Sequence, residues 1–332
     1  MKVSLASLLA AIVLVGCGNG VALWPGTSTN VGARTISARS WMDPAAKAEA
    51  RLLYVSTFPF RGTAGVEVYS WDHRTNVGEL TGVENPRHLC SDKAGNVFVP
   101  DSGKKEILKY AHGGTSPIAI LKDAGRNPWA CSSDPVSGDL AVADGTIDGV
   151  GGDIAIYRKA SGKPTRYTDP RFASYVACGY DDAGNLFIDG TRTTWEPLPH
   201  AQFAEIFKGS TSFTEITLNR RVAEPGSVQW DGKDVAVGDG DVVYRFKIMG
   251  STGTFQGSTD LFGGNGPVHQ FWIPRFGRVN APATRIVAGQ YHFFPYEPGD
   301  VGFWAYPHAG PPLHLLMGPD HPDGVTVSEA TK

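Results

Sequence analysis

One short pattern recurs six times along this chain. An apolar strand ends in Asp or a small polar residue, and a second strand ending in an aromatic residue follows it. The six aromatic residues are Tyr69, Tyr110, Tyr157, Phe207, Phe246 and Tyr306. A repeat of roughly 40–50 residues that contains several short strands is typical of a β-propeller. The pattern therefore predicts an all-β chain folded as a six-bladed β-propeller.

A recurrent anchor position aligns the six copies. Five anchors are Pro86, Pro128, Pro225, Pro267 and Pro322. The fourth copy lacks the Pro, but its Asp181 is in register with Asp92, Asp134 and Asp231, each of which lies six residues after its Pro. The residues two positions after each anchor are His88, Ala130, Ala177, Ser227, His269 and Gly324. The residues three positions after it are Leu89, Cys131, Cys178, Val228, Gln270 and Val325. This period-two alternation predicts an inner strand in each blade, with small side chains where six strands crowd around the axis.

The repeat is split between the two ends of the chain. It begins at a second strand near Leu52, and the missing first strand comes only at Gly324 to Ser328. Pairing of these two segments would close the ring and leave no free sheet edge. We therefore expect residues 51–328 to form one propeller domain whose C-terminal strand closes the first blade, followed by a short tail at 329–332.

The N-terminal segment is typical of an exported protein. Lys2 precedes an apolar run from Val3 to Val15, which is shorter than the roughly 20 residues that a membrane-spanning helix needs. The sequence Leu-Val-Gly-Cys ending at Cys17 resembles the lipobox of bacterial lipoproteins, which implies lipidation of Cys17 and a membrane anchor. Gly18, where an Asp would imply inner-membrane retention, implies the outer membrane or cell surface. The alternative is an ordinary cleaved signal peptide with a chance Cys.

Composition excludes some classes of partner and leaves others open. Residues 18–50 are expected to be a flexible tether that ends in a short helix near 43–50. The chain has 30 basic and 33 acidic residues and no basic stripe, so we expect no nucleic-acid partner. We also expect the protein to be a monomer. Beyond Cys17 the cysteines are odd in number, which implies a free thiol outside the cytoplasm. Cys131 and Cys178 occupy one slot on adjacent blades, and we expect them to be buried small residues rather than a disulfide.

Two motifs resemble a known group of propellers. Asp-Lys-Ala-Gly-Asn at 92–96 and Asp-Asp-Ala-Gly-Asn at 181–185 resemble NHL repeats and blades of the SMP-30/gluconolactonase-like superfamily. The resemblance implies that each motif forms the turn between the first two strands of a blade. Enzymes of that group hold a divalent metal on the axis through Glu, Asn and Asp ligands. The strand at 53–57 has no Glu, and the inner-strand slots have no Asn. A metal-dependent hydrolase, lactonase or lyase with an altered axial site is the alternative to a binding protein.

Two histidines stand out on the inner strands. His88 and His269 occupy slots that hold Ala, Ser or Gly in the other blades. Imidazole binds metals and hydroxylated or anionic ligands, and the adjacent Arg87 could pair with a carboxylate. The alternative is that both rings fill a wide part of the channel and bond to water or backbone. No carboxylate is evident in the same layer.

Other polar residues recur and suggest structural roles. Asp92, Asp134, Asp181 and Asp231 are expected to build turns. Asp101, Asp144, Asp189 and Asp239 end second strands, where a short carboxylate accepts backbone N–H groups.

Two loops are rich in aromatic residues. One contains Tyr291 and His292, and a second insert begins at Trp195. Exposed aromatic loops suit a saccharide or protein partner, whereas the alternative is that these rings cover outer strands. No Gly-x-Ser-x-Gly or His-Glu-x-x-His motif is present. We therefore expect a lipid-anchored, non-catalytic propeller that binds a ligand or protein at one channel mouth. A weaker alternative is a purely structural envelope protein.

Overall fold

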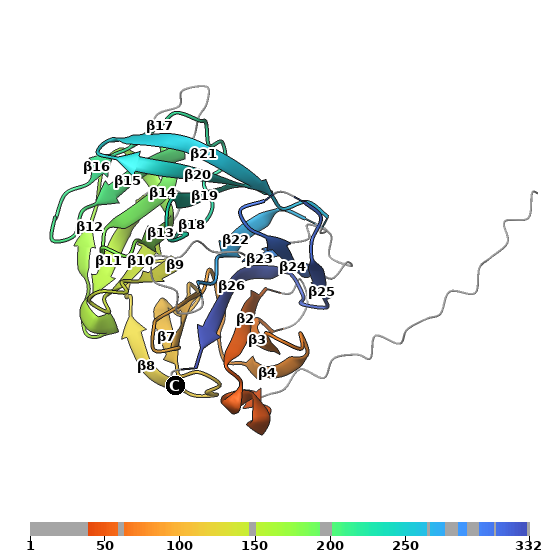
Figure 1. Ribbon diagram of the computed structural model, residues 1–332. Helices are drawn as coiled ribbons and strands as arrows, with labels where there is room; N and C mark the ends of the chain where they lie inside the picture. The colour runs from red at the N-terminus through yellow and green to blue at the C-terminus, as the bar shows by residue number, and fades with distance from the viewer. Residues whose placement is uncertain are drawn as a thin grey trace, which may run out of the picture. The chain divides into compact units, whose positions relative to one another are not determined.

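The computed structural model describes residues 39–58, 63–145, 151–192, 201–263, 266–275, 285–290, 299–308 and 310–330. They belong to one compact unit, Ile36–Lys332. The described strands form six sheets arranged as the blades of a ring, and every strand pair is antiparallel except one short parallel pair in the fifth blade (Figure 1). The predicted all-β, six-bladed propeller is confirmed.

The first three blades use both ends of the chain. Blade one contains β26 (Pro322–Glu329), β2 (Arg51–Thr57), β3 (Gly65–Ser70), β4 (Asn76–Leu80) and β1 (Trp41–Met42). Blade two contains β5 (Cys90–Ser91), β6 (Val97–Asp101), β7 (Glu106–Tyr110) and β8 (Pro117–Lys122). Blade three contains β9 (Pro128–Ser133), β10 (Leu140–Asp144), β11 (Asp153–Tyr157) and β12 (Thr165–Tyr167).

The other three blades follow in chain order. Blade four contains β13 (Phe172–Tyr180), β14 (Leu186–Arg192), β15 (Ala201–Ile206) and β16 (Thr214–Glu215). Blade five contains β18 (Val228–Trp230), β19 (Val235–Asp239), β20 (Val242–Met249) and β21 (Thr252–Asp260), with β17 (Thr217–Leu218) parallel to β21 at its outer edge. Blade six contains β22 (Val268–Trp272), β23 (Arg285–Gln290), β24 (Asp300–Ala305) and β25 (His314–Met317).

The C-terminal strand closes the ring as predicted. β26 pairs antiparallel with β2, and the register runs from Leu52 opposite Ser328 to Ser56 opposite Gly324. In Figure 1 the blue β26 lies beside the orange-red β2. Residues from the two ends of the domain therefore share one sheet, in which β26 is the innermost strand and covers the inner edge of β2.

The described residues also form two short helices. Asp43 caps a 3-10 helix, η1 (Pro44–Ala48), by accepting a hydrogen bond from the backbone N–H of Ala45 at 2.8 Å. The second is η2 (Arg158–Ala160). Trp41 and Met42, which the sequence analysis assigned to the tether, form β1 and pair with β4. Neither helix in the described part of the chain has the length and apolar character that a membrane crossing requires.

The predicted turns depend on aspartate side chains. Asp92 Oδ1 accepts hydrogen bonds from the backbone N–H groups of Ala94 and Asn96, both at 2.9 Å. Asp181 does the same for Ala183 and Asn185 at 2.8 Å. The glycine of each motif has a positive φ, which favours glycine over other residues. Both Asp-x-x-Gly-Asn motifs therefore form the expected turn.

Three of the four strand-end aspartates also accept backbone N–H groups. Asp101 accepts from Glu84 and Asn85 at 2.9 Å, and Asp189 and Asp239 act similarly. The expectation is wrong for Asp144. Its Oδ2 instead accepts from Nη1 of Arg166 at 2.8 Å, because β12 brings this arginine over the strand end. Burial, and then the neighbouring Asp123 and Asp153, raise the pKa of Asp144 to about 10.

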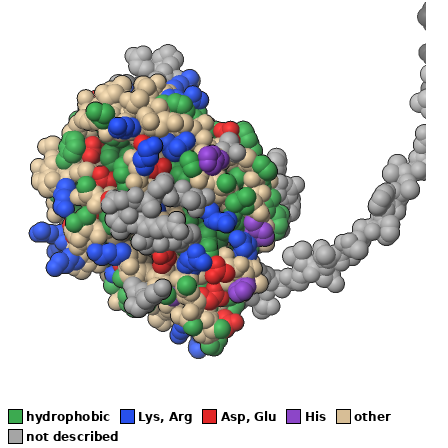
Figure 2. Space-filling view, viewed as in Figure 1, with side chains coloured by type: hydrophobic (Ala, Val, Ile, Leu, Met, Phe, Trp, Pro, Cys, Tyr) green, Lys and Arg blue, Asp and Glu red, His purple; other side chains and the backbone are tan. Residues whose placement is uncertain are grey.

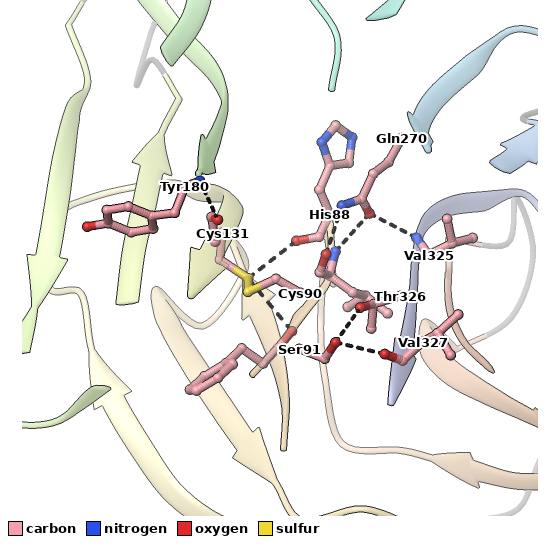
Figure 3. Close-up of a disulfide and its surroundings, with 12 residues drawn as sticks. His88, Cys90, Ser91, Cys131, Tyr180, Gln270, Val325, Thr326 and Val327 are labelled. Carbon is pink, nitrogen blue, oxygen red and sulfur yellow. Dashed lines mark hydrogen bonds between the residues drawn. A yellow bond between two sulfur atoms is a disulfide. The ribbon is translucent and has the colours of Figure 1, made fainter. Parts of the chain in front are cut away.

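The expectation that Cys131 is a buried cysteine outside any disulfide is also wrong. Cys90 and Cys131 form a disulfide with a Cα–Cα distance of 5.6 Å (Figure 3). Cys178 is free and buried. Cys131 and Cys178 share a slot, so their side chains point the same way around the ring. Cys90 lies one position further along its strand, and the alternation of side chains turns it toward the next blade. The disulfide therefore links blades two and three.

The aromatic repeat shifts by one position in blade four. Tyr110 lies opposite Val97, and Tyr157 lies opposite Leu140, in their antiparallel pairs. The corresponding partner of Leu186 is Ile206, which is buried. Phe207 therefore lies just beyond the strand and is 41% exposed, unlike the five other repeat aromatics, which are all buried.

Candidate functional site

The inner segments of the six blades surround the axial channel and give it two mouths. Arg87, Trp129, His269 and Asp323 lie where inner segments begin, and we call this end the Asp323 mouth. The opposite end, where Tyr180 and Trp230 end inner strands and Arg275 follows one, is the Arg275 mouth. Because the Asp323 mouth contains two of the predicted histidines, it is the candidate functional site.

His88 is a buried polar side chain of this mouth without a hydrogen-bond partner among the described residues. It is 3% exposed. In Figure 3 its ring projects away from the hydrogen bonds that surround it. Burial lowers the pKa of His88 to about 4, with Asp323 opposing the shift and His269 and Arg87 adding to it. The ring is therefore neutral at pH 7 and offers one N–H donor and one acceptor.

Asp323 gathers the charged groups of the mouth. Its Oδ1 lies 2.8 Å from Nδ1 of His269, and its Oδ2 lies 3.7 Å from Nη1 of Arg87. The carboxylate is 2% exposed. Burial alone would raise the pKa of Asp323, but the His269 hydrogen bond and the charges of His88, His269 and Arg87 lower it to about 2. Asp323 is therefore ionised at neutral pH, and it orients the half-exposed ring of His269.

Trp129 connects Arg87 to the buried histidine. The guanidinium carbon of Arg87 lies 4.1 Å from the centroid of the Trp129 ring, a cation–π distance. The His88 ring meets Trp129 edge-on, with centroids 6.2 Å apart. The His88 backbone N–H also donates to the Trp129 carbonyl at 3.0 Å. These contacts hold Arg87 against Trp129 and fix the position of His88 between two blades.

His88 separates two cavities along the axis. A cavity of about 230 Å³ at the Asp323 mouth is lined by His88, Trp129, Glu224, Pro225, Val268 and His269. A second cavity of about 180 Å³ lies toward the Arg275 mouth and is also lined by His88. At that mouth Arg275 donates to both carboxylate oxygens of Asp182, at 2.5 and 2.7 Å, which ties blade six to blade four.

The described residues contain no group of three or more His, Cys, Asp or Glu side chains that could hold a metal ion. His88, His269 and Asp323 gather at one mouth, but they do not converge on a common point in that way. In the described part of the propeller we therefore find no ligand set for the alternative hypothesis, a metal-dependent hydrolase, lactonase or lyase. The chemistry that the mouth offers is hydrogen bonding by a neutral imidazole beside an oriented histidine–aspartate pair.

The structure brings together three of the predicted site residues. Arg87, His88 and His269 all lie at the Asp323 mouth. Trp195, Tyr291, His292 and the predicted lipidation residue Cys17 lie outside the described residues. The expectation that no carboxylate shares the layer of the histidines is wrong, because Asp323 contacts His269 directly.

Sequence reasoning missed Asp323 and Trp129, although a signal was present. The residues one position after the six anchors are Arg87, Trp129, Val176, Gly226, Val268 and Asp323. Three of these six are polar or aromatic, and the structure places them side by side on blades one, two and three. Comparing this slot as well as the next two would have found the complete cluster.

Comparison with known proteins shows the fold alone. No family model matches the sequence, and no curated protein matches it significantly. A chain in the crystal structure of a nidogen/laminin complex is 10% identical with a TM-score of 0.59, and the match covers 85% of this chain and 99% of that one. A protein of unknown function from Bacteroides caccae, solved at 1.35 Å resolution, is 13% identical with a TM-score of 0.59 over 84% and 99% of the two chains. These likenesses support the six-bladed propeller.

Proposed function

We propose that this protein is a lipid-anchored, extracytoplasmic β-propeller that binds a ligand, or an inserted side chain of a partner, at the Asp323 mouth. The observation that carries the proposal is the unpaired imidazole of His88 at the wall of a cavity. A buried polar group without a partner costs about 1–3 kcal/mol. A bound hydroxyl or amide group would recover that cost, because it can accept from one ring nitrogen and donate to the other.

The dimensions and polarity of the cavity favour a small ligand. A volume of about 230 Å³ corresponds to roughly eight water molecules at about 30 Å³ each. Pockets for drug-sized ligands are larger, on the order of 300–1,000 Å³. Pro225 and Val268 supply apolar wall, while His88 and His269 supply polar groups. This combination of apolar lining and few polar groups is typical of a binding site.

Two features support a location outside the cytoplasm. The first is the N-terminal apolar run that ends at Cys17. The second is the Cys90–Cys131 disulfide, because structural disulfides form and persist in oxidising compartments. Replacement of Cys17 by Ser should release the protein from the membrane fraction. Recovery of that variant in the membrane fraction would contradict the anchor.

The binding proposal is tested by a ligand screen on the purified, tag-free domain. Small hydroxylated, amide and carboxylate compounds would be scored by chemical-shift changes in NMR spectra. We expect compounds that bind the wild type to lose binding in His88→Leu and to weaken in His269→Ala. The matched control is His73→Leu, which changes an exposed histidine away from the channel. If all detected binding survives both mouth substitutions, the proposal fails.

The same preparation tests the enzymatic alternative. A stoichiometric divalent ion in metal analysis of the tag-free protein would favour a metal-dependent hydrolase or lyase. Binding that needs His88 but no added metal would favour the binding protein.

A further inference from the structure

A groove between blades three and four lies apart from the Asp323 mouth. Its volume is about 420 Å³, larger than that of either channel cavity. Its walls come from β11 and β12 of blade three and from β14 and β15 of blade four. The turns at Asp134 and Gly184, which follow inner strands, also line it, so the groove opens on the Arg275 side of the ring. We call it the Phe207 groove.

The floor of the Phe207 groove is apolar and aromatic. Leu186 and Ile206 are buried at its base, and Tyr167 and Tyr180 are partly buried along it. Phe207 is 41% exposed, because the aromatic repeat is displaced by one residue in blade four. An exposed aromatic residue within an apolar groove that has a polar rim is typical of an interaction surface. Aromatic side chains are also the residues that most often anchor such contacts.

The rim carries two cations and two carboxylates that differ in exposure: Arg158 and Lys208 are exposed, whereas Asp139 is partly buried and Asp134 is buried. Asp134 and Asp139 accept hydrogen bonds from the backbone N–H groups of Val136 and Lys159, both at 2.8 Å. Their carboxylates are therefore engaged in local turns. The side chains of Arg158 and Lys208 line the same groove, and among the described residues neither has an ion-pair or hydrogen-bond partner. The cationic groups that remain available to a partner lie beside an apolar floor.

We propose that the Phe207 groove binds an acidic, extended segment of a partner protein that carries apolar side chains. In an extended chain, successive side chains point to opposite faces. Alternating acidic and apolar residues would then direct one set toward Arg158 and Lys208 and the other onto Phe207 and Tyr167. This surface differs in location and chemistry from the small-ligand site at the Asp323 mouth, so either proposal can fail without the other.

Fluorescence anisotropy with two synthetic peptides tests this proposal. In the probe peptide, Asp or Glu alternates with Leu or Phe. In its matched partner, Lys replaces every acidic residue. We expect the wild-type protein to bind the acidic peptide at least about tenfold more tightly than the basic one. The affinity for the acidic peptide should fall as salt is added, because exposed charges are screened.

Substitutions on the surface complete the test without disturbing the core. Phe207→Ala should weaken acidic-peptide binding by about tenfold, which is the loss typical of an interface anchor. Arg158→Glu combined with Lys208→Glu should reverse the preference in favour of the basic peptide. The controls are Met249→Ala, which removes an apolar side chain that is 69% exposed, and Lys247→Glu on the same blade-five strand.

Three results would overturn the proposal. They are no binding of the acidic peptide, equal affinity for the two peptides, or groove variants that bind as tightly as the two controls. Because each substituted side chain is exposed, circular dichroism should show unchanged folding in every variant.

Discussion

The side-chain amide of Gln270 makes two hydrogen bonds to the backbone of Leu89. Its Oε1 accepts from the Leu89 N–H at 2.9 Å, and its Nε2 donates to the Leu89 carbonyl at 2.8 Å. The same Oε1 accepts from the N–H of Val325 at 2.8 Å (Figure 3). One buried side chain therefore connects blades six, two and one across the point where the ring closes.

Replacing Gln270 by Ala should destabilise the propeller by about 3 kcal/mol. The substitution leaves the N–H and C=O of Leu89 and the N–H of Val325 buried without partners, and each such group costs about 1–3 kcal/mol. Urea unfolding measures the change. Gln256→Ala is the matched control, because Gln256 is exposed on β21. Equal midpoints for the two variants would show that the amide does not contribute to closure.

The disulfide between blades two and three should also contribute to stability. Cys90 and Cys131 are separated by 41 residues, and closing a loop of that length in the unfolded chain is worth about 4 kcal/mol in the chain-entropy account. We expect Cys90→Ala with Cys131→Ala to lower the unfolding free energy by several kcal/mol. Cys178→Ala, which removes the free buried thiol, should change it less. A double variant as stable as the wild type would contradict this expectation.

The protonation of His88 should make stability depend on pH. The folded-state pKa of about 4 lies below the ordinary value of 6.5, so the unfolded chain binds the extra proton first as pH falls. Stability is therefore retained above about pH 6.5 and falls progressively toward pH 4, by on the order of 3 kcal/mol. His88→Asn should flatten the profile in this window. The lowered pKa of Asp323 acts below it, between about pH 4 and pH 2. An unchanged slope in His88→Asn would rule out His88 as its source.

The sequence predicts the ring better than it predicts the contacts between blades. Period-two alternation and the anchor positions identify the inner strands, and the split repeat predicts the pairing of β26 with β2. These are properties of single strands and of their order, which local patterns encode. The Cys90–Cys131 pair was missed because it depends on which faces of neighbouring inner strands meet.

The candidate site shows the same division. His88 and His269 were identifiable because they depart from the residues of equivalent slots. Asp323 was missed because it lies about 50 residues from His269 in the chain, and only ring closure brings the two side chains together. Phe207 followed the aromatic spacing but lies one residue beyond the strand end, so its exposure depends on the register of β15 against β14.

Figure 2 shows basic and acidic side chains dispersed over the visible face, with apolar side chains between them. The proposals therefore rest on local clusters of defined residues rather than on a charge field of one sign. At the Asp323 mouth, buried Asp323 contacts His269 and Arg87, and the buried ring of His88 has no hydrogen-bond partner among the described residues. At the Phe207 groove the cations are exposed and the carboxylates are engaged by turns.

The most direct test is a comparison of two C-terminal deletions by urea unfolding. One removes everything from Pro322 onward, and with it β26 and Asp323, whereas the control removes only residues from Ala330 onward. We predict that the longer deletion abolishes cooperative unfolding, because β2 loses its partner and blade one loses its innermost strand, while the control unfolds like the full chain. A longer deletion that retains the full-length midpoint and slope would contradict closure of the ring by β26, and with it the site that β26 completes.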